Sequence, residues 1–164
     1  MIARILIDGG ILTAIFVICV VVVLYFNPRI MLSDYPELIK AKVPARTKKE
    51  TQIAIIVSIP LFVIAIVLPL YSVWLLKEQT GELSYWLAFA TIFAEYFLVS
   101  MFDLIVLDLW MFFAWTPKFL VLPGTEGMPA YKDWRPHTKE QLTTGNLIIV
   151  IASAVLAIVP AWLF

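Results

Sequence analysis

The sequence alternates between long apolar runs and shorter polar segments. Four runs carry few or no charges, and they cover residues 11–26, 53–76, 84–115 and 145–164. Each is long enough, once the two glycines before the first run are included, to supply the about 20 residues that a helix needs to cross a hydrocarbon core. The apolar residues form blocks rather than alternating as in a half-buried strand. The pattern predicts an all-α bundle of four transmembrane helices.

Composition supports a membrane protein over a soluble one. Hydrophobic residues make up 62% of the 164 residues and charged residues only 15%. A soluble domain of this length keeps a large part of its surface in water and cannot bury so much apolar side chain. The formal net charge is zero, so nothing indicates a nucleic-acid partner. The lipid bilayer is therefore the expected partner.

The basic residues predict how the chain is oriented. The loop over residues 27–52 carries six Lys and Arg and the loop over 116–144 carries four, which together make ten of the twelve in the chain. An excess of Lys and Arg in short loops marks the cytoplasmic side of a membrane. We therefore predict a plasma (inner) membrane protein with both loops in the cytoplasm and both termini outside.

Short matches between the two halves indicate an internal duplication. Residues 26–30 and 115–119 both read aromatic, polar, proline, basic, apolar. Thr47 and Thr138 each begin a pattern typical of a capping box, in which a Thr and a later Glu or Gln satisfy the free amides that open a helix. We predict two tandem hairpin repeats, about 1–77 and 84–164, within one membrane domain over residues 1–164.

Three carboxylates in the third run are the first candidates for chemistry. Glu95, Asp103 and Asp108 interrupt it, and an ionised side chain at membrane depth costs about 2.5–3.5 kcal/mol on insertion scales. A helix over residues 84–115 would be about 48 Å long against a core of about 30 Å, so it must tilt or project, yet Asp103 falls within the core whichever end is anchored.

The chemistry of these carboxylates has two explanations. No Lys, Arg or His lies within the predicted spans to neutralise them, so a proton or cation site, led by Asp103, and a structural hydrogen bond to a neighbouring helix both fit. At about 100° per residue, Asp103 and Asp108 lie far apart around an α-helix, which argues against a pair on this helix alone. Pro69, inside the second run, frees the carbonyl of Ala65, which could bind an ion or simply mark a bend.

The second loop supplies further candidates. A glycine turn with basic residues around it could hold an anionic lipid headgroup or a phosphate through backbone amides and charge. The candidates for this role are Gly124, Thr125, Lys118, Lys132 and Arg135. His137 is the only histidine and is a weak acid–base candidate, and one histidine among scattered carboxylates predicts no metal site and no cofactor. In the first loop, Asp34 and Glu37 predict a short interfacial helix that ends near Lys42.

Three functions fit these features. The lack of a recognisable catalytic set favours a non-enzymatic scaffold or accessory subunit that acts through lipids, a partner membrane protein or a second copy of the chain. The first alternative is a small proton- or cation-coupled transporter that uses Asp103. The second alternative is a lipid-acting enzyme at the cytoplasmic interface, with Asp108, Asp133 or His137 as acid or base. A continuous polar cavity at Asp103 would favour transport, and a dry hydrogen-bonded contact there would favour the scaffold.

Overall fold

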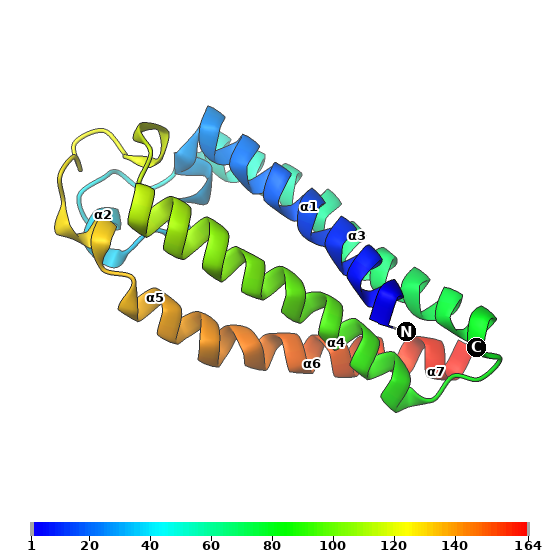
Figure 1. Ribbon diagram of the computed structural model, residues 1–164. Helices are drawn as coiled ribbons and strands as arrows, with labels where there is room; N and C mark the ends of the chain where they lie inside the picture. Colours follow the sequence, from blue (N-terminus) through cyan, green and yellow to red (C-terminus); the bar gives the residue numbers. More distant parts are fainter. Residues whose placement is uncertain (1, 164) are drawn as a thin grey trace.

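The computed structural model describes residues 2–163 and forms a bundle of four long helices (Figure 1). The first three are α1 (Ile2–Phe26), α3 (Lys48–Thr80) and α4 (Tyr85–Phe102), which continues as the π-helical segment η2 (Asp103–Trp115). The fourth consists of α5 (Arg135–Glu140), the π-helical η5 (Gln141–Gly145), α6 (Asn146–Leu156) and α7 (Ile158–Leu163). Residues 2–163 contain no β-strand, so the all-α prediction is confirmed.

The outside of the bundle is apolar. Four helices, Ile2–Phe26, Lys48–Thr80, Tyr85–Trp115 and Arg135–Trp162, are long and apolar enough to cross a membrane. Ile55, Ile59 and Phe62 of α3 are all more than half exposed. A continuous surface of this kind is unfavourable in water and suits lipid. The chain is therefore a small membrane protein built from four apolar helices.

The two ends of the bundle differ. Both termini and the turn between α3 and α4 lie at one end, which we call the terminal end, and the two long loops lie at the other, the loop end (Figure 1). Gly81, with φ of 76°, ends α3 in the left-handed conformation that glycine adopts without strain. Ser84 then caps α4 by accepting a hydrogen bond from the Leu87 amide at 3.1 Å. The membrane orientation and the tandem duplication stay predictions.

The helices after the two long loops begin differently. The predicted capping box at Thr47 is confirmed, because its hydroxyl accepts from the Glu50 amide at 3.2 Å and the Glu50 carboxylate accepts from the Thr47 amide at 2.7 Å. The predicted capping box at Thr138 is wrong. The fourth helix begins at Arg135, three residues earlier, with Pro136 in its first turn, where the missing amide of proline is tolerated.

The first loop is less helical than predicted. A 3₁₀-helix, η1 (Pro28–Asp34), precedes α2, which covers only Glu37–Lys40 and has Pro36 rather than Asp34 at its N-terminal boundary. The second loop contains two further 3₁₀ turns, η3 (Lys118–Leu120) and η4 (Pro129–Lys132). Residues of the two loops pack against each other, with Ile39 of α2 among them.

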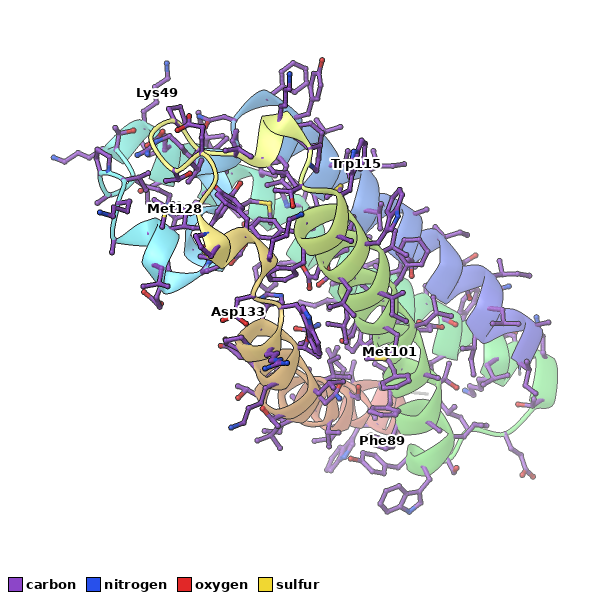
Figure 2. The ribbon with its side chains drawn as sticks, turned by 60° about the vertical axis from the view of Figure 1, so that its left-hand side comes forward. Lys49, Phe89, Met101, Trp115, Met128 and Asp133 are labelled. Atoms are coloured by element: carbon purple, nitrogen blue, oxygen red, sulfur yellow. The ribbon has the colours of Figure 1, made fainter. Side chains whose placement is uncertain are left out.

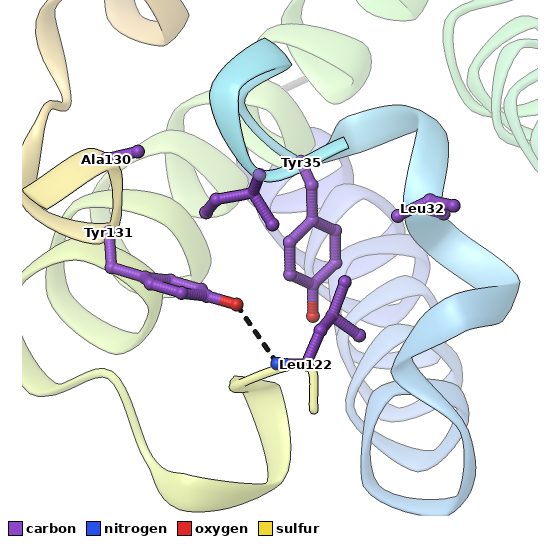
Figure 3. Close-up of a cluster of buried hydrophobic side chains, with 6 residues drawn as sticks. Leu32, Tyr35, Leu122, Ala130 and Tyr131 are labelled. Atoms are coloured by element: carbon purple, nitrogen blue, oxygen red, sulfur yellow. Dashed lines mark hydrogen bonds between the residues drawn. The ribbon is translucent and has the colours of Figure 1, made fainter. Parts of the chain in front are cut away.

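A small hydrophobic core joins the two loops, and we call it the loop core (Figure 3). It consists of Leu32, Tyr35, Ile39, Leu122, Ala130 and Tyr131. The Tyr35 hydroxyl donates to the Leu120 carbonyl at 2.8 Å, and the Tyr131 hydroxyl accepts from the Leu122 amide at 3.0 Å. Burial raises the pKa of Tyr35. The loop core therefore packs the two long loops against each other at the loop end of the bundle.

The hydrogen bond of Tyr35 gives the first prediction. Tyr35→Phe removes the hydroxyl and leaves the buried Leu120 carbonyl unpaired, so we expect the free energy of unfolding to fall by about 1–3 kcal/mol. Unfolding of the purified protein in mixed micelles, followed by circular dichroism, measures the change. Tyr25→Phe is the matched control, because the Tyr25 side chain is 65% exposed and should tolerate the change. Equal stability of both variants would contradict the assignment.

Candidate functional site

A cavity of about 300 Å³ lies between the four long helices. Its walls are mostly apolar and come from every helix, with Leu12 and Phe16 of α1 and Ile64 of α3 among them. The polar groups in the wall are Tyr96, Ser100, Asp103 and Gln141. An apolar cavity with a few convergent polar groups is the usual form of a small-ligand site.

The carbonyl that Pro69 frees lies at this cavity. The Tyr96 hydroxyl donates to the Ala65 carbonyl at 2.6 Å, and both residues line the cavity. The hydrogen bond replaces the one that the missing proline amide would have made within α3. The freed carbonyl therefore ties α3 to α4, and an ion could use it as a ligand only if Tyr96 moved away.

Asp103 lies where the third helix changes its hydrogen-bonding register. From Asp103 to Trp115 the helix is π-helical. In its last backbone hydrogen bond the Thr116 amide donates to the carbonyl of Met111, five residues earlier, at 2.8 Å. The rotation of about 100° per residue in an α-helix, which would place Asp103 and Asp108 far apart around the axis, does not apply to this π-helical segment. The wider turn brings residues five apart closer to one face, and π-helical segments often occur at functional sites.

Asp108 is paired with the single histidine. A 2.8 Å hydrogen bond joins the Nε2 atom of His137, on α5, to the Oδ2 atom of Asp108. Their side chains are 31% and 20% exposed. The expectation that no cation would neutralise the carboxylates is wrong for Asp108, because the fourth helix begins early enough to carry His137 alongside η2.

Further acidic groups surround this pair. Asp103 interacts electrostatically with His137, and so does Asp34 of the first loop. One turn deeper along the fourth helix, the Gln141 amide nitrogen donates to the Ser100 hydroxyl at 3.0 Å. We call Asp34, Asp103, Asp108 and His137 the loop-end cluster. It comprises Asp103 in the cavity wall, the hydrogen-bonded Asp108–His137 pair and the exposed loop residue Asp34.

Glu95 lies in a separate polar cluster nearer the terminal end. Its side chain is fully buried, and its Oε1 atom accepts a 2.6 Å hydrogen bond from the Ser72 hydroxyl of α3. Asp8, only 4% exposed, stands one residue before Gly9 in α1 and pairs with Arg4. Sequence reasoning missed Asp8 because it lies outside the apolar run; its i, i+4 spacing from Arg4 was the available signal.

The predicted anion-binding residues do not surround one open site. The Gly124 amide donates to the Glu126 carboxylate at 3.0 and 3.1 Å. Thr125 is buried and hydrogen-bonds the Leu122 carbonyl and the Tyr131 hydroxyl, each at 2.7 Å.

The basic residues of the same loop have different surroundings. The Lys132 amine donates to the carbonyls of Phe113 and Ala114 and to the Thr116 hydroxyl, so it satisfies the end of η2. Arg135 lies 6.0 Å from the Trp134 ring centre, and Lys118 is exposed. Headgroup binding therefore stays a prediction, and the exposed Lys118 and Arg135 are its best-placed candidates.

The remaining candidates are spread over the loop end. Figure 2 shows Asp133 just before α5, and its side chain is exposed to solvent. No group of three or more His, Cys, Asp or Glu side chains within residues 2–163 is arranged to hold a metal ion.

Comparison of the chain with protein-family models, with curated proteins and with solved structures gives no match. The chemistry of the cavity must therefore be argued from the chain itself.

The Asp108–His137 pair gives the second prediction. A double-mutant cycle with Asp108→Asn and His137→Gln should show a coupling free energy of about 1 kcal/mol near pH 6, because the partly exposed pair is then an ion pair. Near pH 9 the imidazole is neutral and the coupling should shrink. Unfolding in micelles measures both values. The same cycle with Asp133→Asn in place of Asp108→Asn is the control and should show no coupling.

Proposed function

We propose that this protein is a small membrane carrier for protons or small cations, with Asp103 as the group that binds them. The observation that supports this proposal is the placement of Asp103 in the wall of a cavity between the four helices. Acidic side chains inside membrane bundles face cavities or protein partners because lipid cannot solvate them. The Asp103 carboxyl group makes no side-chain hydrogen bond with any of residues 2–163, so a purely structural role has no side-chain contact to support it.

The surroundings of Asp103 fit ion exchange. Three groups interact electrostatically with Asp103: Asp108 and His137, which are hydrogen-bonded to each other, and the exposed Asp34 of the first loop. Carboxylates and a histidine in series are the groups that carry protons in pumps and transporters. A proton or cation on Asp103 would also remove the cost of an unpaired charge in an apolar cavity. Binding of a proton or a cation at Asp103 would therefore stabilise the folded bundle.

The scaffold hypothesis finds less support. A scaffold needs intramembrane polar groups that fix helix contacts, as the hydroxyl of Tyr96 does with Ala65. Asp103 fixes no such contact, although an aspartate is expensive to insert at this depth. An apolar residue at position 103 would serve a static bundle better. This comparison favours the carrier and leaves partner proteins and oligomeric state as predictions.

The carrier proposal gives the third prediction. Proteoliposomes that contain the wild-type protein should take up protons, Na⁺ or K⁺ when a membrane potential is imposed, as followed by a pH-sensitive dye and by cation-sensitive dyes. Asp103→Asn keeps the shape of the side chain but cannot ionise, so flux should fall to the level of protein-free vesicles. Asp133→Asn is the matched control, because Asp133 is exposed and is not among the residues that line the cavity.

Two results would overturn the carrier proposal. One is unchanged flux through an Asp103→Asn protein that elutes and folds as the wild type does. The other is a wild-type protein that moves none of the three ions across the vesicle membrane. Circular dichroism and gel filtration in detergent establish that each variant is folded before its flux is compared.

A further inference from the structure

Among residues 2–163, Glu95 is the one carboxyl-bearing side chain that solvent does not reach at all. It is fully buried at the level where α1, α3 and α4 meet. Gly9 of α1 lies directly against it: a Cβ atom at position 9 would stand 3.3 Å from the Glu95 Cα and 3.4 Å from its Cγ. A side chain at position 9 would crowd the Glu95 backbone and the stem of its side chain, so the glycine lets α1 pack closely against α4 at Glu95.

The hydrogen bonds of Glu95 match a protonated acid. Its Oε1 atom accepts from Ser72 at 2.6 Å, whereas its Oε2 atom is buried and has no hydrogen-bond partner among residues 2–163. An ionised carboxylate in this position would leave a charged oxygen without a donor, which is costly in a low-dielectric interior. A neutral carboxylic acid has one carbonyl oxygen to accept from Ser72 and carries its proton on the other.

Arg4 of α1 is a basic group whose charge acts on Glu95. Among residues 2–163, Asp8 of α1 and Tyr96 of its own helix also interact with it electrostatically, and the Ser72 hydroxyl of α3 donates a hydrogen bond to it. Arg4 uses its Nε atom for Asp8, and a guanidinium carries four further N–H donors. It can therefore bridge two carboxylates, and its own side chain is 23% exposed.

We propose that Glu95 is a second proton-binding site of the bundle, held neutral between Ser72 and Gly9 and served by Arg4 when it loses its proton. On release, the O–H bond of the acid breaks, the proton passes to water at the terminal end, and the guanidinium of Arg4 becomes the shared counter-ion of Glu95 and Asp8. On uptake these changes reverse, and Arg4 returns to Asp8 alone. The proposal does not depend on ion transport by Asp103.

Infrared spectroscopy of the full chain in nanodiscs tests this proposal and gives the fourth prediction. The wild type should show a carbonyl stretching band of a buried carboxylic acid near neutral pH, which disappears as the pH is raised to about 10. Glu95→Gln should remove that component. Asp103→Asn should leave it in place, and Glu82→Gln is the control at an exposed position. A wild-type spectrum without the band, or a band that survives Glu95→Gln, would overturn the proposal.

Two variants that keep Glu95 test its surroundings, and they remain informative if Glu95→Gln does not fold. Ser72→Ala should move the band to higher frequency, because the carbonyl of the acid loses a hydrogen bond. Arg4→Gln should make the band persist to a pH about one unit higher or more, because the ionised form loses its counter-ion. A band that neither variant changes would show that the acid is not at Glu95.

Discussion

The low dielectric of the bundle interior is the constraint on which the other features depend. Four carboxyl groups, those of Asp8, Glu95, Asp103 and Asp108, lie on α1 and on the third helix, whose other residues are mostly apolar. Each must be paired, neutral or hydrated, because an isolated charge among apolar side chains is too costly to keep. The chain meets this requirement differently for each group. These differences distinguish structural groups from groups that can exchange a ligand.

Two of the carboxylates have a basic partner in the structure. Asp8 pairs with Arg4 one turn away on the same helix, and Asp108 pairs with His137 from the fourth helix. The second pairing requires the fourth helix to begin at Arg135 and η2 to be π-helical. The loop core and the Lys132 contacts to the end of η2 hold these segments in place. Asp103 and Glu95 have no such partner, and this sets them apart.

The sequence was sufficient to predict the number of helices and the ends of the third one, because membrane spans follow from length and hydropathy alone. It also singled out Asp103 as a candidate, since this carboxyl group falls within the hydrocarbon core whichever end of the third helix is anchored. It could not predict the contacts of His137, because the start of the fourth helix is set by Pro136 and by packing rather than by the Thr138 pattern. Nor could it predict π-helical geometry, which residue propensities do not encode. The close approach of Gly9 to Glu95 likewise depends on how two helices cross.

Glu95 and Asp103 stand eight residues apart on the third helix, roughly 12 Å along its axis. Asp103 lines the cavity and Glu95 does not. Tyr96 lies between the two sites, and its hydroxyl is held by the Ala65 carbonyl that Pro69 frees. While that hydrogen bond persists, the Tyr96 hydroxyl is not free to donate to either carboxyl group. Exchange between the two sites by way of Tyr96 would therefore require this hydrogen bond to break, and with it a direct contact between α3 and α4.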